Sequence, residues 1–399
     1  MDIGAKLKAW GVENTQLAFA LLRTLKPNVS VGNVGVITRF TDVQEALSRP
    51  DIFGVTYAEK MAAITDGSNF FLGMNPSAHY TRDVSIMRLL FRGRDVSDRI
   101  APLIAQISAQ LLEDSRGEVD VIQHLMRKVP ARLTAQYIGV DNVEEEALID
   151  WNTLMFRYLF YPNNPPELKA RALASAALFR REVERCIAGR KASPTQADDI
   201  LNRALALQRS GTEGISDRQL RDNLIGIIIG LIPTTAACSA LVIDYLLDHP
   251  HQLRDAQEAA RNNDDERLRK YTLEALRFNS FGAGVFRILL EDYTLARGTL
   301  RAKCYKQGTT VLVATQSAMH DSRQLTHPQR FSLTRPDYHY MHFGYGMHRC
   351  FGYHINMVQI PQIIKVLLRK RNLKRAEGTA GRTLYEGPFP RHLYLTFDH

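Results

Sequence analysis

One cysteine near the end of the chain stands in a setting that favours metal binding. Cys350 lies in the stretch 343–352, which reads Phe-Gly-Tyr-Gly-Met-His-Arg-Cys-Phe-Gly, and an apolar segment with helical character follows it. Gly344 and Gly346 allow backbone conformations that side chains disfavour, so several amide N–H groups can turn toward one sulfur. Those N–H groups and the positive end of the following helix dipole stabilise a thiolate, the form of cysteine that binds metal. A lone thiolate suits a metal that is already held by something else, such as the iron of a porphyrin.

The alternative for an isolated cysteine is a buried structural side chain beside a glycine turn. Here the whole pattern matches, position by position, the heme-binding signature of the cytochrome P450 superfamily, at Phe343, Gly344, Gly346, His348, Cys350 and Gly352. The chain therefore resembles that superfamily. The resemblance implies a b-type heme (iron protoporphyrin IX) whose metal is bound by Cys350. It also implies further cofactor-binding positions at Phe343, Gly344, His348 and Gly352.

The resemblance implies the cytochrome P450 fold, mainly α with small β-sheets. The chain has 399 residues, 45% of them apolar, and no Pro-, Ser- or Gly-rich linker divides it. We therefore predict one heme-thiolate domain over residues 1–399. Residues 1–27 mix charged with apolar side chains, so we expect neither a signal peptide nor a membrane anchor. The four cysteines lack metal-site or disulfide spacing, which agrees with a reducing compartment and a cytoplasmic location.

The net charge of +9, from 51 Lys and Arg against 42 Asp and Glu, is dispersed along the chain. No basic tail or nucleic-acid motif is present, so we expect no nucleic-acid partner. Arg349 and a downstream cluster lie close in sequence to Cys350 and favour an acidic protein partner; the cluster comprises Lys365, Arg369, Lys370, Arg371, Lys374 and Arg375. Basic residues that favour a helix C-terminus explain this cluster equally well. Since no flavin or iron–sulfur motif is present, electrons must come from separate proteins, and we expect a ferredoxin-type donor and its reductase.

Residues 223–243 form an apolar run without a charged side chain, long enough to span a bilayer. A transmembrane helix and a buried central helix both explain such a run, because a helix surrounded by protein is apolar on every side. Pro233, Thr234 and Ser239 in the middle of the run, with mixed charges on its flanks, favour the buried helix. We therefore predict a core helix and no membrane partner.

Inside this run, residues 230–235 fall where the family has its oxygen-activation motif. That motif has a small residue, a glycine, any residue, an acid and two threonines. The resemblance makes Thr234 the hydroxyl of oxygen activation, with Thr235 beside it, but Pro233 stands in place of the acid. A proline gives no N–H to the carbonyl of Ile229, so we expect the helix to bend or widen near Gly230. Proline also cannot relay protons, which general acids commonly do at an advantage of roughly 10²–10⁴-fold.

Three hypotheses follow from Pro233. Water held by Thr234 supplies the protons, or a polar group of the substrate does, or the oxidant arrives already reduced as a peroxide. We predict a monooxygenase that inserts one oxygen atom from O₂ into a small apolar or amphiphilic organic substrate. The alternative enzyme is a peroxygenase or hydroperoxide isomerase. A non-enzymatic alternative is a heme-binding sensor or carrier.

Further motifs extend the resemblance toward the heme and the substrate. Glu274 and Arg277 give the Glu-x-x-Arg of the family's K helix, a structural i, i+3 pair that can bridge on one helical face. Arg287, in the strand expected after that helix, matches an arginine that pairs with a heme propionate. His79, at an expected helix opening, matches a second propionate contact, since a buried carboxylate requires charge-assisted donors.

The resemblance places six residues in the substrate pocket: Phe70, Phe71, Gly230, Val285, Phe286 and Phe389. Core packing explains Phe70 and Phe71 at least as well. Near the N-terminus, residues 34–40 are typical of a strand and residues 42–47 of a helix, with Asp42 as its N-cap.

Overall fold

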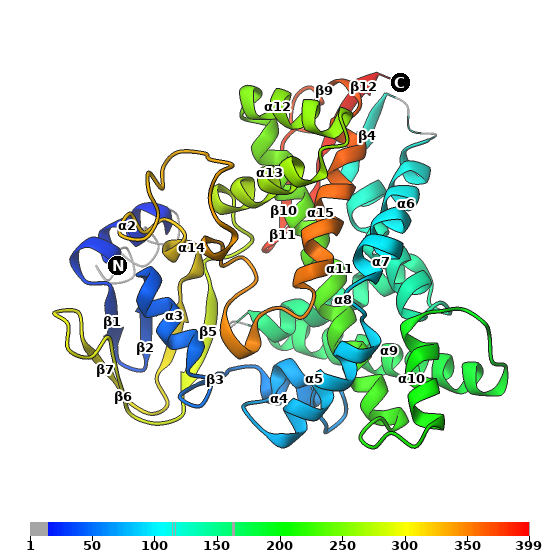
Figure 1. The fold of residues 1–399 in the computed structure, drawn as a ribbon, viewed down its shortest axis with the longest axis horizontal. Helices are drawn as coiled ribbons and strands as arrows, with labels where there is room; N and C mark the ends of the chain where they lie inside the picture. The colour runs from blue at the N-terminus through cyan, green and yellow to red at the C-terminus, as the bar shows by residue number, and fades with distance from the viewer. Residues whose placement is uncertain (1–14, 114, 116, 162–163, 399) are drawn as a thin grey trace. The chain divides into compact units, whose positions relative to one another are not determined.

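The computed structural model describes residues 15–113, 115, 117–161 and 164–398. They form two compact units, one with residues 15–56 and 282–350 and the other with residues 57–281 and 351–398. Helices predominate, and small sheets accompany them (Figure 1). This confirms the predicted fold class, whereas the single domain over residues 1–399 stays a prediction.

The first unit contains a five-stranded sheet with the strand order β1-β2-β8-β5-β3. β2 and β8 pair in parallel, and the other neighbours are antiparallel. Alternate side chains of β2 and β8 are buried, as expected for strands with one face on a core. β6 and β7 form a separate antiparallel pair. The strands are β1 (Asn28–Val31), β2 (Val34–Ile37), β3 (Phe53–Val55), β5 (Val285–Leu289), β6 (Tyr293–Leu295), β7 (Lys303–Tyr305) and β8 (Thr310–Val313).

The helices of the first unit complete its core. α3 buries Phe40, Val43 and Leu47, which lie on one helical face, against sheet residues such as Val311 and Val313. α14 packs against both α3 and α2. The helical elements are α2 (Thr15–Leu25), α3 (Phe40–Ser48), α14 (Thr315–Ala318) and the short turns η5 (Asp337–His339) and η6 (Gly346–His348).

The prediction that Asp42 caps a helix is wrong. α3 begins at Phe40, and Asp42 lies inside its first turn, fully buried. The Arg301 guanidinium pairs with the Asp42 carboxylate at 2.9 Å, and the Asn28 amide donates to it at 2.8 Å. A buried carboxylate needs such donors, so tertiary pairing, rather than capping, explains the acid at this position.

The second unit is a set of helices packed around α11, which contacts α8, α9, α12, α13 and α15 (Figure 1). The helices are α4 (Ala58–Ile64), α5 (Ala78–Leu90), α6 (Ala101–Glu113), α7 (Lys128–Leu133), α8 (Glu145–Phe160), α9 (Pro166–Ala192), α10 (Ile200–Arg209), α11 (Asp217–Leu247), α12 (Pro250–Arg261), α13 (Asp265–Phe278) and α15 (Tyr353–Leu368). Shorter helical turns are η1 (Phe71–Gly73), η2 (Val96–Ile100), η3 (Ile122–Met126) and η4 (Thr134–Ile138).

α11 contains the apolar run predicted from the sequence. A capping box starts it, in which Ser216 and Gln219 satisfy each other's backbone N–H groups. It is the one helix among the described residues that is long and apolar enough to cross a membrane, and 78% of its most apolar window is buried in the protein. Such burial is the property expected of a core helix.

Two small sheets complete the second unit. One has the antiparallel order β4-β12-β9, and the other is the hairpin β10–β11. Gly387 provides the positive φ of +60° that the hairpin turn uses. The strands are β4 (Glu118–Asp120), β9 (Arg371–Arg375), β10 (Leu384–Glu386), β11 (Phe389–His392) and β12 (Tyr394–Asp398).

Glu274 and Arg277 form an ion pair in the interior of the second unit. Two guanidinium nitrogens of Arg277 donate to the two carboxylate oxygens of Glu274, each at 2.9 Å, and both side chains are fully buried. Arg277 also lies over the ring of Phe278, 4.2 Å from its centroid. Removing one partner of such a pair leaves an uncompensated charge in the core.

We therefore expect Glu274→Ala to lower the free energy of unfolding by about 3–5 kcal/mol, measured by chemical denaturation. The matched control is Glu266→Ala, which removes an i, i+3 partner of Arg269 on the same helix. The Glu266 side chain is 66% exposed, so its loss should cost at most about 1 kcal/mol. Equal losses in the two variants would contradict a special stabilising role for the buried pair.

Candidate functional site

Three backbone hydrogen bonds fold the stretch before Cys350 back on itself. The N–H of Cys350 donates to the carbonyl of Phe343 at 2.8 Å, which closes the loop. The N–H of Gly344 donates to Met341 and that of Arg349 to Gly346, each at 3.1 Å. The Cys350 side chain is partly exposed, and none of the four cysteines forms a disulfide. The loop thus presents one thiol at its end.

The two glycines of the loop both adopt the left-handed conformation, with φ of +71° at Gly344 and +70° at Gly346. Their surroundings differ. A Cβ at Gly344 would come no closer than 3.8 Å to the carbonyl oxygen of His348, whereas a Cβ at Gly346 would overlap the carbonyl oxygen of Leu47. The loop therefore lies directly against the end of α3, and only glycine allows that approach.

β5 lies in the same unit as the cysteine loop, and it carries three residues that the sequence predicted to lie near the heme or the substrate. Arg287 is buried, and its guanidinium donates to the carbonyl of Phe286 at 2.8 Å. Val285 packs against the core of the unit, and Phe286 is partly buried. Because side chains alternate along a strand, Phe286 faces the opposite side from Val285 and Arg287.

α11 carries a stripe of partly exposed residues on an otherwise buried surface. Between Leu220 and Ile243, the positions that are not buried are Ile227, Gly230, Thr234 and Cys238. Their spacing of three or four residues places them on one helical face. The Thr234 hydroxyl donates to the carbonyl of Gly230 in this stripe. Thr234 therefore lies where a molecule beside α11 can reach its oxygen.

Thr235 lies away from this stripe. Its side chain is buried, and its hydroxyl donates to the Oδ1 atom of Asn356 on α15 at 2.9 Å. The sequence placed both threonines in one catalytic motif, but the structure gives them different neighbours. Thr235 joins α11 to α15, and Thr234 is part of the partly exposed stripe.

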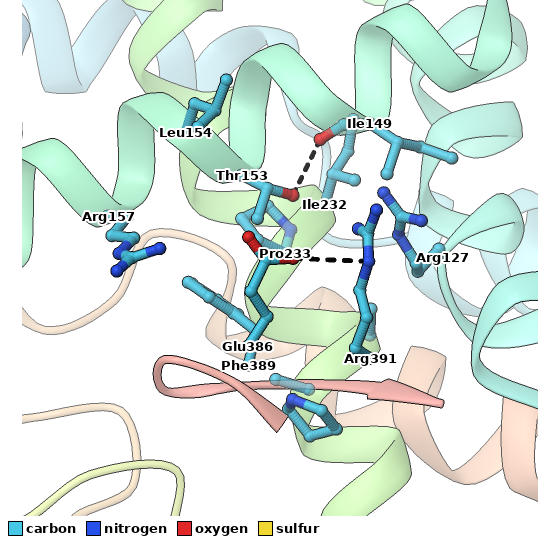
Figure 2. Close-up of a pocket in the computed structure, with 13 residues that line it drawn as sticks. Arg127, Ile149, Thr153, Leu154, Arg157, Ile232, Pro233, Glu386, Phe389 and Arg391 are labelled. Carbon is cyan, nitrogen blue, oxygen red and sulfur yellow. Dashed lines mark hydrogen bonds and ion pairs between the residues drawn. The ribbon is translucent and has the colours of Figure 1, made fainter. Parts of the chain in front are cut away.

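Pro233 is buried on another face of α11 and lines a pocket of the second unit (Figure 2). α11 continues as a helix across Pro233. Phe389 of the β10–β11 hairpin lines the same pocket, so the structure brings these two predicted residues together. The other residues of the lining are Arg127, Ile149, Thr153, Leu154, Arg157, Ile232, Ala236, Ala237, Glu386, Pro390 and Arg391.

The charged side chains of this pocket were not predicted. Arg127 is buried and pairs with Asp150 at 2.5 Å, and Arg391 pairs with Glu386 at 3.5 Å. Burial lowers the pKa of Arg127, repulsion from Arg391 lowers it further, and attraction to Asp150 partly offsets both. These residues come from segments far apart in the sequence, and no local motif identifies them.

The predicted residues His79, Phe70 and Phe71 lie at or near α5. His79 is exposed in the first turn of that helix. Phe70 is buried so close to Gly226 of α11 that a Cβ there would overlap its ring. Phe71 is fully buried, and its ring packs against Phe351 at a centroid distance of 5.2 Å. This placement favours the core-packing interpretation of both phenylalanines.

Several members of the basic cluster at residues 365–375 are engaged within the second unit. Lys365 is buried and pairs with Asp265 at 2.5 Å. Arg375 pairs with Asp244 at 3.0 Å and with Asp248 at 2.8 Å. Arg369 donates to the carbonyl of Ala260 at 2.9 Å. These contacts favour a structural role for much of the cluster over a role in partner binding.

The chain is similar to a known family model, to curated proteins and to solved structures. The family model described as Cytochrome P450 matches residues 33–394. Cytochrome P450 107B1 from Saccharopolyspora erythraea is 27% identical over 333 residues, which cover 79% of this chain and 76% of the relative. 6-deoxyerythronolide B hydroxylase from the same organism is 25% identical over 293 residues, 72% of this chain and 68% of the relative. The crystal structure of CalO2 superimposes with a TM-score of 0.82 at 22% identity and covers 98% of this chain and 97% of that chain.

The different surroundings of Gly344 and Gly346 predict that a side chain is tolerated better at Gly344 than at Gly346. Gly344→Ala should lower the free energy of unfolding by about 1–2 kcal/mol, the strain of one left-handed residue. Gly346→Ala adds an overlap with backbone and should cost about 2–5 kcal/mol. Urea denaturation of both variants measures the difference. A Gly346 variant no less stable than the Gly344 variant would show that the approach to Leu47 is not tight.

Proposed function

This chain belongs to the cytochrome P450 family, and on that premise we propose that Cys350 supplies the thiolate that binds its heme b. The protein is a heme-thiolate oxidoreductase of the monooxygenase type. The observation that carries the assignment of Cys350 is the loop closed by the Cys350–Phe343 hydrogen bond and built on two left-handed glycines. Phe343, Gly344, His348 and Gly352 are the proposed cofactor-binding residues around it.

The residues present fit a heme. In the described part of the chain, no group of three or more His, Cys, Asp and Glu side chains is placed to hold a metal ion. A metal with one protein ligand must be held mainly by its own macrocycle, as iron is in heme. The buried Arg287 and the exposed His79 are the proposed donors to its propionates. When bound, the heme supplies the redox centre at which oxygen is activated.

The contribution of α11 to the reaction is the hydroxyl of Thr234. The hydroxyl proton is donated to Gly230, so the oxygen lone pairs are available to accept a hydrogen bond from water. We assign to Thr234 the task of holding a water molecule as proton source, because Pro233 has no proton to give. Thr235 supports this arrangement by fixing α11 to α15 through Asn356.

The proposed substrate is a small apolar or amphiphilic molecule. Phe389 and Pro233 line a pocket with mostly apolar walls, and Gly230 lies on the open stripe of α11. Phe286, on the side of β5 opposite Val285, is a further proposed substrate contact, whereas the predicted contact Val285 packs against the core of its own unit. The named activity of one relative, a hydroxylase, supports insertion of oxygen into an organic molecule. We propose a separate ferredoxin-type donor with its reductase, and a cytoplasmic location, on the sequence arguments given above.

A second candidate, a peroxygenase or hydroperoxide isomerase, is favoured by Pro233 alone. A reduced oxidant brings its own protons, so an enzyme of this kind needs no acid at that position. The two candidates differ in whether O₂ and reductant together support turnover.

The ligand assignment predicts the absorption spectrum of the reduced protein with carbon monoxide. Cys350→Ser should lose the absorption band typical of a thiolate-bound heme, since a serine oxygen replaces the sulfur. The control Cys304→Ser changes an exposed cysteine on β7 and should keep the wild-type spectrum. The same thiolate band in the Cys350 variant would rule out this cysteine as the ligand.

Thr234→Ala should reduce product formation from O₂ and reductant about tenfold or more, with more hydrogen peroxide released, because the hydroxyl that holds water is gone. The assay uses a substrate found by screening for ligands that shift the spin state of the ferric iron. Thr272→Ala is the matched control, since Thr272 makes the same kind of bond, to Leu268 at 3.0 Å, in α13. An unchanged ratio of product to hydrogen peroxide in the Thr234 variant would contradict the role of Thr234. Turnover of the wild type with peroxide alone would favour the second candidate.

A further inference from the structure

A groove of the first unit lies between α2 and the segment 320–330, which follows α14. It is open to solvent and has a volume of about 400 Å³, which is in the range of small-molecule sites. Three guanidinium groups line it, of Arg23, Arg323 and Arg330, together with one carboxylate, of Asp321. This α2 groove therefore contains more positive than negative charge, and the proposed function uses none of its residues.

Arg23 is the buried cation of the α2 groove. The residue is 7% exposed, and its Nη1 atom donates to the hydroxyl of Ser317 on α14 at 2.9 Å. α2 and α14 pack against each other (Figure 1), so this bond fixes the guanidinium. Within residues 15–113, 115, 117–161 and 164–398, the Arg23 side chain donates no other hydrogen bond and pairs with no carboxylate. A guanidinium has five N–H donors, so most of those of Arg23 are left for a ligand in the groove.

The carboxylate of Asp321 is engaged by other groups than Arg23. One of its oxygens accepts a hydrogen bond from the N–H of Phe40 at 3.1 Å, and the other pairs with the Arg323 guanidinium at 3.4 Å. Burial lowers the pKa of Arg23, attraction to Asp321 partly offsets this effect, and repulsion from Arg323 lowers the pKa further. A charge held out of water without a paired counterion is destabilised, so a bound anion would relieve that penalty.

The segment that carries Arg330 is held in place by protein contacts. The buried Arg335 guanidinium donates to three backbone carbonyls of this segment, at 3.0, 2.9 and 2.9 Å, those of Thr326, His327 and Arg330. These bonds fix the backbone, while the Arg330 residue itself is exposed. A site whose backbone is already ordered loses less entropy when it binds a ligand.

We propose that the α2 groove binds a phosphate group, free or carried by a small organic molecule, with its oxygens on the Arg23 guanidinium. Arg323 and Arg330 add positive charge around the same groove. Guanidinium groups match phosphate in geometry and form paired, charge-assisted hydrogen bonds with it. A phosphate monoester carries about two negative charges at neutral pH. Three guanidinium groups against one carboxylate favour such a ligand over an anion with a single charge.

The test compares phenyl phosphate with benzenesulfonate, which has the same ring and a single negative charge. Isothermal titration calorimetry of the holoenzyme is done at about pH 7.5, where a phosphate monoester is mostly a dianion. Phenyl phosphate should bind about tenfold or more tightly than benzenesulfonate. Arg23→Gln should weaken phenyl phosphate binding about tenfold or more, because the charge-assisted contact is lost. Arg23→Lys keeps the charge without the paired geometry and should lie between Arg23→Gln and the wild type.

A second variant is needed because Arg23 is buried and its loss can disturb folding. Arg330→Gln changes an exposed residue of the same groove and should weaken phenyl phosphate binding about threefold. The control Arg297→Gln changes an exposed arginine between β6 and β7, outside the groove, and should bind phenyl phosphate as the wild type does. Far-UV circular dichroism verifies that the variants are folded. If Arg23→Gln does not fold, Arg330→Gln alone decides.

Equal affinity of the wild type for phenyl phosphate and benzenesulfonate would overturn the proposal, and so would wild-type affinity for phenyl phosphate in the folded variants. Inorganic phosphate is the second probe. If it binds as tightly as phenyl phosphate, the site takes free phosphate, and if it binds more weakly, the site takes an organic phosphate; either result supports a phosphate site. These titrations do not involve Cys350, so their outcome is independent of the proposed function.

Discussion

The approach of the cysteine loop to α3 is the constraint on which the proposed site depends. Gly346 takes a left-handed conformation and leaves no space for a Cβ beside the carbonyl of Leu47. α3 is in turn held by Phe40 and Leu47 in the core and by the buried Asp42 with its partner Arg301. The position of the Cys350 thiol is thus determined by packing that begins some three hundred residues earlier in the chain. A loop supported in this way can hold the proposed ligand in position without a second metal-binding side chain.

α11 divides its functions between its faces. The open stripe contains Gly230 and Thr234, whereas Pro233 lines a pocket on another face and Thr235 bonds to Asn356 of α15. Pro233 contributes to the lining of the pocket, and Thr235 joins α11 to α15. A residue on the stripe can instead contact a reacting molecule. The resemblance implies an acid at the position of Pro233. A proline there has no proton to relay, and it adds an apolar surface to a pocket.

The features that the sequence predicted are those with a local signal. The glycine spacing around Cys350, the i, i+3 spacing of Glu274 and Arg277, and the uncharged run in α11 each lie within one segment. Asp42 was assigned wrongly because a helix-capping residue and a buried ion-pair partner have the same amino-acid type, and only the distant Arg301 distinguishes them. The arginines of the pocket could not be predicted at all, since α8, the segment before α7 and the β10–β11 hairpin meet only in the folded chain.

The β10–β11 hairpin has a consequence for how such an enzyme changes during evolution. This short hairpin carries Phe389, Glu386 and Arg391, so it supplies both an aromatic wall and charges of either sign to the pocket. β10 is exposed along its whole length, and exposed positions tolerate substitution at little cost in stability. Selection can therefore change the lining of this pocket through a few hairpin residues, while the helices that form its other walls remain as they are.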